Sequence, residues 1–228
     1  MLLRRLLALY AGLWLYGFSM AVMLRAALGL DPWDVFHQGV TAHVPFSFGT
    51  VVAITGALVL LAWIPLRQWP GLGTVSNVVV IGISVDVGIR MLPELENLPL
   101  RVGAMLAAVL LNAIATVLYI GAGMGPGPRD GLMTGLVRRT GRPVWLIRTG
   151  LEATVLAVGF LLGGSVGIGT LVYAFGIGPL IQLLIPYVNG YLPGFQDAGE
   201  QAGDALGEDL GGGAHLGRPR LELAVEGE

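Results

Sequence analysis

Two pairs of opposite charges lie inside otherwise apolar stretches of the chain. Asp86 and Arg90 are four residues apart, and so are Arg148 and Glu152, with the order of the charges reversed. Residues at this spacing share one face of a helix and can pair. Ionisable groups inside a membrane are costly and commonly functional. Each pair could serve a substrate or a proton, or it could neutralise itself and hold helices in register. Arg90 and Arg148, near segment ends, could also reach the membrane interface.

The deeper of these charges has a polar counterpart in the second half of the chain. Asp86 corresponds to Gln182 at an offset of 96 residues. A polar group repeated within two apolar segments is expensive unless it faces protein or a water-filled path. We therefore predict that Asp86 and Gln182 lie near the midplane of the membrane.

A Gly-x-x-Pro-x-Asp element occurs twice at the same offset and ends at Asp34 and Asp130. Each proline suits the first position of a helix, Asp31 is a good N-cap, and each aspartate then lies in the first turn at the positive end of the helix dipole. A helix of about ten to twelve residues is too short to cross a bilayer. The aspartates could only stabilise these helix starts, or the paired starts could line a substrate site. Arg129 adds a positive charge at the position where the first copy has Trp33.

The elements that must position these residues are membrane-spanning helices. The chain has 228 residues, 54% hydrophobic and 12% charged, whereas a soluble domain has about 25% charged residues. A helix needs about 20 mostly apolar residues to cross the bilayer. The sequence therefore predicts an all-α protein of six spans, which are Leu6–Leu24, Phe48–Leu66, Thr74–Leu92, Val102–Gly121, Val144–Leu162 and Gly167–Tyr187.

The spans form two copies of one unit. Besides the Pro–Asp elements, the Gly-x-Gly-Thr motif at 71–74 recurs at 167–170, again 96 residues on. We place repeat one at about 6–92 and repeat two at about 102–187, within a membrane domain of residues 1–195. Three spans per copy turn the second copy upside down, which is a known transporter plan with its site where the halves meet. A duplication retained only for packing would leave the same trace.

Arginine placement predicts the orientation. With the N-terminus inside, seven arginines fall in inside segments, and Arg101 is the clear exception outside. Short cytoplasmic loops are enriched in basic residues. We expect a multi-pass protein of the bacterial plasma membrane with both termini in the cytoplasm. Residues 196–228 are acidic, rich in glycine and without Phe, Trp or Tyr, so we predict a disordered cytoplasmic tail.

Missing residue types remove several kinds of chemistry. The chain contains neither cysteine nor lysine, so thiolate catalysis, disulfides, P-loops and lysine Schiff bases are excluded. His37 and His43 are six residues apart and do not share a helical face, so no metal site is predicted. No catalytic set and no basic stripe with interleaved aromatics are evident. We expect no enzyme, no cofactor and no nucleic-acid partner.

Several stretches match one known pattern: Gly29–Gly39, Ile64–Thr74, Gly125–Met133, Arg148–Glu152 and Gly176–Pro179. On these residues the chain resembles the YczE/YitT-like family of bacterial integral membrane proteins. The resemblance covers about residues 10–187, and the Gly-Pro-Arg-Asp-Gly run is specific. It implies a bacterial plasma-membrane protein and supplies no catalytic residues. The acidic tail lies outside the shared pattern.

The leading functional expectation is a transporter-like or channel-like protein for a small solute. Its partners would be the lipid bilayer, the solute and a second copy of the chain. The predicted path involves the intramembrane charges and the two Pro–Asp helix starts: Asp34, Asp86, Arg90, Arg129, Asp130, Arg148, Glu152 and Gln182. The alternative is a non-transporting accessory protein that assists a secretion or biosynthetic system, with the cytoplasmic tail as one route of contact.

Overall fold

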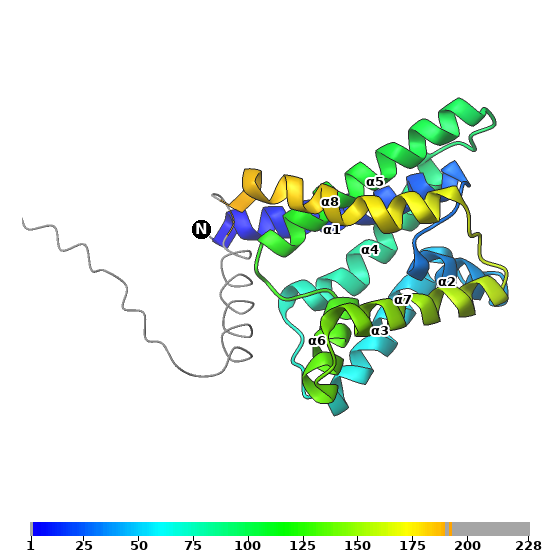
Figure 1. Ribbon diagram of the computed structural model, residues 1–228. Helices are drawn as coiled ribbons and strands as arrows, with labels where there is room; N and C mark the ends of the chain where they lie inside the picture. Colours follow the sequence, from blue (N-terminus) through cyan, green and yellow to red (C-terminus); the bar gives the residue numbers. More distant parts are fainter. Residues whose placement is uncertain (1, 190–191, 193–228) are drawn as a thin grey trace, which may run out of the picture.

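All regular structure in the described part of the chain is helical. The computed structural model describes residues 2–189 and 192. Six of its helices are long and apolar enough to cross a membrane, and two short ones, α2 and α6, begin at prolines, which confirms the predicted fold class. The predicted tail at 196–228 lies outside the described residues. In order (Figure 1), the helices are α1 (Leu2–Ala26), α2 (Pro32–Thr41), α3 (Phe48–Leu66), α4 (Leu72–Met91), α5 (Leu98–Gly121), α6 (Pro128–Thr140), α7 (Val144–Leu161) and α8 (Ile168–Asn189).

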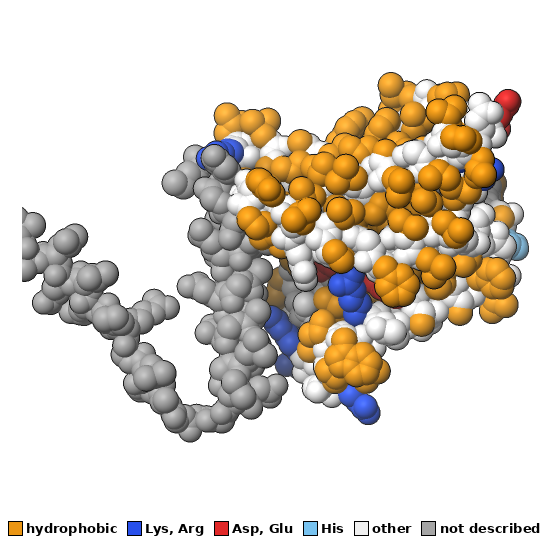
Figure 2. All heavy atoms as spheres, turned by 45° about the horizontal axis from the view of Figure 1, so that its top comes forward, with side chains coloured by type: hydrophobic (Ala, Val, Ile, Leu, Met, Phe, Trp, Pro, Cys, Tyr) orange, Lys and Arg blue, Asp and Glu red, His pale blue; other side chains and the backbone are white. Residues whose placement is uncertain are grey.

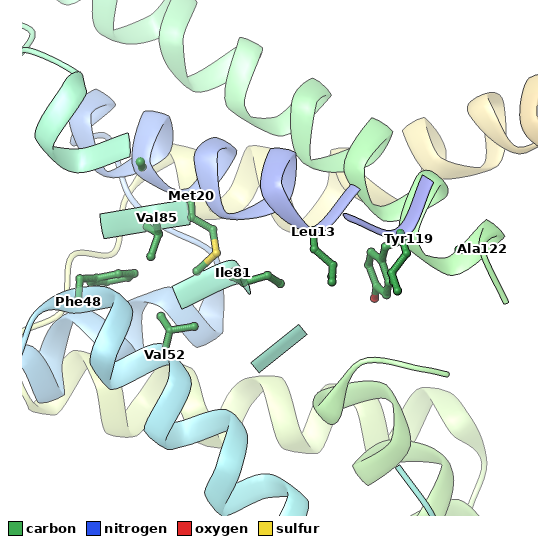
Figure 3. Packing of buried hydrophobic residues seen from close by; sticks show 10 residues of the cluster. Leu13, Met20, Phe48, Val52, Ile81, Val85, Tyr119 and Ala122 are labelled. Carbon is green, nitrogen blue, oxygen red and sulfur yellow. The ribbon is translucent and has the colours of Figure 1, made fainter. Parts of the chain in front are cut away.

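Apolar side chains are distributed as a lipid environment requires. Figure 2 shows them spread over the outer face of the molecule, and several large ones, such as Ile64 and Phe175, are more than two thirds exposed. A soluble protein rarely exposes so much contiguous apolar surface. Inside, α1, α3, α4 and α5 share a buried core that includes Leu13, Met20, Phe48, Val52, Ile81, Val85 and Tyr119 (Figure 3).

The two halves have the same sequence of elements. Each helix of the second half begins 96 residues after its counterpart in the first, with starts at Leu2 and Leu98, Pro32 and Pro128, Phe48 and Val144, and Leu72 and Ile168.

The first helices of the two halves, α1 and α5, are antiparallel and cap each other. Arg5 donates to the carbonyls of Ala122 and Gly123 at 2.7 and 2.6 Å, beyond the end of α5. Its counterpart Arg101 donates to the carbonyl of Ala26 at 2.8 Å, at the end of α1. Free carbonyls at a helix C-terminus are good partners for arginine. The inversion of one copy relative to the membrane stays a prediction, and an antiparallel pair of counterpart helices is the arrangement it requires.

Each short helix packs against a long helix of the other half through a glycine. A Cβ on Gly159 of α7 would lie 2.4 Å from the backbone nitrogen of Phe36 in α2. A Cβ on Gly131 of α6 would lie 1.9 Å from the indole of Trp63 in α3. The two contacts differ in which helix supplies the glycine. In the contact of α7 with α2 it is the long helix, through Gly159, and in the contact of α3 with α6 it is the short helix, through Gly131. Trp63 of α3 is the counterpart of Gly159. Both contacts allow the backbone of one half to approach the other half closely.

The halves differ in how their last two helices pack. In the first half α3 lies along α4, and a Cβ on Gly49 would come within 1.9 Å of the carbonyl of Gly82. In the second half α7 packs on α2 and α6 and makes at most marginal contact with α8. The counterpart of Gly49 is Trp145, so the glycine at this contact is not repeated in the second half. Figure 1 shows α7 and α8 in different layers of the molecule.

The glycine contacts between halves predict a stability difference between two alanine variants. Gly131→Ala should lower the melting temperature, because its methyl group would overlap Trp63 and overpacking costs about 1–3 kcal/mol. Gly103→Ala is the matched control, since Gly103 lies in a helix with open space around it and alanine favours helix. Thermal unfolding of the purified variants measures both. Equal melting temperatures would contradict the predicted contact.

Candidate functional site

The loops before α2 and α6 are each held by the opposite half. The Gly73 N–H at the start of α4 donates to the carbonyl of Met124 at 2.7 Å, and the Gly169 N–H at the start of α8 donates to that of Leu28 at 2.8 Å. Gly29 and Gly125, which adjoin these carbonyls, have φ near +111° and +115°, a conformation that favours glycine. The repeated Gly-x-Gly-Thr motif thus positions both short helices.

The start of α2 is a buried network of acidic groups. The Asp31 carboxylate accepts hydrogen bonds from the N–H groups of Trp33 and Asp34 at 2.8 and 3.0 Å, as predicted for an N-cap. One turn on, the Asp34 carboxylate is 3.1 Å from Nδ1 of His37, and both side chains are only 2% exposed. Two carboxylates are therefore held close together in the interior.

Arg129, from the start of α6, faces both of these carboxylates. Its guanidinium nitrogens are 3.8 Å from an oxygen of Asp31 and 3.9 Å from an oxygen of Asp34, and its Cζ lies 4.9 Å from the ring centre of Trp33. Trp33 and Arg129 occupy equivalent positions in the two halves. The first copy has no basic residue at this position, and the single arginine of the second copy lies beside the acids of the first.

Asp130 has a different environment from its counterpart Asp34. It accepts a hydrogen bond from the Tyr119 hydroxyl at 3.0 Å, and Tyr119 packs edge-on against Tyr16 with ring centres 6.0 Å apart. Among the described residues, no arginine lies within ion-pair distance of the Asp130 carboxylate. Gly127 precedes α6 where Asp31 precedes α2, and it provides no side-chain cap.

These groups surround a cavity of about 350 Å³ between the two halves. All eight helices or the turns before them contribute to its wall. Arg148 and Glu152 of α7 line it as a pair, with Nε 3.1 Å from Oε1. Figure 2 shows a hollow between two bands of apolar side chains, in which arginine and acidic side chains are visible. The polar and aromatic lining residues include Tyr16, Asp31, Trp33, His37, Thr55, Asn77, Thr116, Tyr119, Arg129, Asp130, Arg148, Glu152 and Tyr173.

Burial dominates the electrostatics at the start of α2. It raises the pKa of Asp31 to about 7, with a further increase from the charge of Asp34, and Arg129 opposes both effects. Burial likewise raises the pKa of Asp34 to about 6, again against the attraction of Arg129. The pKa of His37 falls to about 3, because burial and the nearby guanidinium disfavour an imidazolium. His37 is therefore a neutral partner of Asp34.

The structure brings together part of the predicted path. Arg129, Asp130, Arg148 and Glu152 line the cavity, and Asp34 lies against Arg129. The predicted pairing of Arg148 with Glu152 is confirmed.

Asp86 has different partners in the structure from the predicted one, Arg90. Its carboxylate accepts hydrogen bonds from the Ser47 hydroxyl at 2.5 Å and the Gly49 N–H at 2.8 Å, so it caps the start of α3 instead of pairing with Arg90. Gln182 is exposed and does not line the cavity, and Arg90 is exposed near the end of α4.

Sequence reasoning missed the aromatic wall and the role of His37. Tyr16, Tyr119 and Tyr173 come from three spans and line the cavity. The sequence held one signal: Tyr173 is the counterpart of Asn77, so a polar side chain recurs at this position of the two spans. Both residues line the cavity. Asn112 behaves as expected of an interhelical polar residue: it donates to Ser19 at 2.9 Å and accepts from Tyr173 at 3.0 Å. Among the described residues, no group of three potential metal ligands is found.

The fold and the cavity define a multi-pass α-helical membrane protein in which two half-helices begin at a polar centre. Residues 3–186 match the family described as a family of unknown function (DUF6198), and the chain belongs to that family. It is similar to an uncharacterized protein of Haemophilus influenzae, with 35% identity over 74% of this chain and 78% of the relative. It is also similar to the uncharacterized membrane protein YczE of Bacillus subtilis, with 32% identity over 78% of this chain and 83% of the relative. No solved structure matches. The family resemblance read from the sequence is thus confirmed.

The buried acids beside Arg129 predict a pH-dependent stability defect. Because the folded pKa values of Asp31 and Asp34 exceed their ordinary value, these groups contribute stability at low pH that is lost as pH rises through about 6 to 7. Arg129→Gln should raise both pKa values further. Its melting temperature should approach that of the unmodified protein at about pH 5 and fall well below it at about pH 8, where uncompensated buried charge costs about 3 kcal/mol or more.

The matched control for this measurement is Arg148→Gln. Arg148 and Glu152 are 59% and 39% exposed, so their ion pair contributes little to stability and little pH dependence is expected. Melting curves of the Arg129→Gln variant that stay parallel to those of the unmodified protein between these pH values would refute the proposed charge balance.

Proposed function

We propose that this protein moves a small solute across the membrane through the cavity between its halves. The observation that carries the proposal is the cavity of about 350 Å³ at which both short helices begin. Non-helical backbone in a membrane protein is tolerated where it is buried or lines a cavity, and broken helices form the substrate sites of many inverted-repeat transporters. A packing-only duplication does not require charged and tyrosine side chains around an open volume.

The packing difference between the halves supplies a mechanism. In the described conformation α3 lies along α4, while α7 and α8 are apart. In the alternative conformation the two halves would exchange these packings, with α7 lying along α8 and α3 apart from α4. The cavity would then close on one side and open on the other. In an inverted repeat the two sides face opposite membrane surfaces, which is alternating access. An accessory protein has no need of this exchange.

Engineered disulfides test the exchange, because the chain has no cysteine of its own. An ideal Cβ on Gly56 of α3 lies 3.7 Å from the Cβ of Val78 in α4, which suits a disulfide. The double variant Gly56→Cys with Val78→Cys should therefore cross-link. The equivalent pair in the second half is Glu152→Cys with Ala174→Cys, which should cross-link only when α7 packs along α8.

We expect both pairs to form intramolecular disulfides in membranes, the first quickly and the second more slowly. Mass spectrometry of the linked peptides reports the yield, and the single variants control for links between molecules. If the first pair forms and the second never does, the halves are static. Transport by exchange would then be abandoned in favour of the accessory role.

A further inference from the structure

We propose that the ligand of this cavity is a small organic cation, such as a substituted ammonium or guanidinium ion. This inference rests on the proposed function and names the substrate class.

The wall has more carboxylates than arginines, and both arginines are already opposed. Arg148 pairs with Glu152 at 3.1 Å, and Arg129 lies between Asp31 and Asp34 at 3.8 and 3.9 Å. An anionic ligand would have to displace a carboxylate from one of these arginines. A cation at Asp130 would displace no carboxylate, although the charges of Arg129 and Arg148 also act on that carboxylate.

Asp130 is the acid that remains for a ligand. Among the described residues, the Tyr119 hydroxyl donates the one side-chain hydrogen bond that Asp130 accepts, and no guanidinium lies within ion-pair distance of its carboxylate. A carboxylate can accept several hydrogen bonds, so Tyr119 leaves capacity for an ammonium donor. Asp130 lines the cavity, which makes it accessible to a ligand there.

The positive ends of the two short helices do not favour an anion here. Asp31 binds two of the free N–H groups of α2, and Asp34 and Asp130 lie in the first turns of α2 and α6. Acidic groups at these positions offset the helix dipole. An anionic ligand would therefore gain less from the helix dipole at either N-terminus.

Aromatic rings complete a site suited to a cation. Tyr16, Trp33, Tyr119 and Tyr173 line the cavity from α1, α2, α5 and α8. Ring faces attract ammonium and guanidinium groups, and aromatic cages recognise quaternary ammonium ions. The chain already uses this chemistry internally, since the Arg129 guanidinium lies over Trp33 with carboxylates beside it. A free cation at Asp130 would meet a carboxylate that holds the Tyr119 hydroxyl, with further aromatic side chains in the same cavity wall.

The test uses a single cysteine in the cavity and two thiol reagents of opposite charge. Thr55→Cys places the thiol in the cavity wall, and Asn97→Cys places one at the exposed start of α5 as the control. At position 55, the positively charged trimethylammonium-ethyl methanethiosulfonate should react faster than the negatively charged sulfonatoethyl methanethiosulfonate. The ratio of the two rates at position 55 should exceed the ratio at 97 by about tenfold or more, because an acidic cleft concentrates cations.

Protection identifies the ligand class directly. Tetramethylammonium should slow the reaction of Thr55→Cys with an uncharged thiol reagent, and acetate should not. Adding Asp130→Asn should reduce the rate preference and the protection, whereas Asp86→Asn, which removes a carboxylate outside the cavity, should leave both unchanged. The protection measurement on Thr55→Cys alone does not depend on the folding of the Asp130 variant.

The outcomes separate the two proposals. Equal rate ratios at 55 and 97, or protection by acetate and not by tetramethylammonium, would overturn the cation assignment while leaving a water-filled cavity for transport. No reaction at 55 with either reagent, while 97 reacts, would show a cavity closed to water and overturn both proposals.

Discussion

Lipid cannot hydrogen-bond a peptide group, and this constraint governs the two places where the chain breaks into a short helix. The loops before α2 and α6 have non-helical backbone inside the bundle. Each is satisfied from the opposite half, through the N–H groups of Gly169 and Gly73 at the starts of α8 and α4. Neither half could bury its own break alone. The association of the halves and the position of the site therefore have one physical cause.

Once the two breaks are held together, the charges around them must balance locally. Asp31 and Asp34 are buried, and burial raises their pKa values until a nearby cation opposes it. Arg129 supplies that charge from the other half, at the position equivalent to Trp33. A tryptophan in place of Arg129 would leave these two buried acids unopposed. The difference between the copies thus follows from the electrostatics of one shared centre.

The second departure from symmetry concerns the packing of the last two helices of each half. Close approach at Gly49 and Gly82, together with the Asp86 cap, joins α3 to α4, whereas Trp145 stands at the position of Gly49 in the second half and α7 makes at most marginal contact with α8. The cavity lies where this contact is missing. A protein with a fixed scaffold role gains nothing from one loose pair of helices. The proposed transport would require two packings of similar free energy for each copy of the unit.

Local sequence patterns were sufficient to predict the six apolar spans, the proline-started short helices, the Asp31 cap and the offset of 96 residues. These follow from local rules, because hydropathy, helix length and capping depend on neighbours in the chain. Which charges meet depends on the tertiary fold. Asp86 caps α3 and does not pair with Arg90, while Arg129 reaches acids almost 100 residues away. Those contacts depend on how closely the helices of different halves approach and on the face each one presents, and no local pattern specifies either.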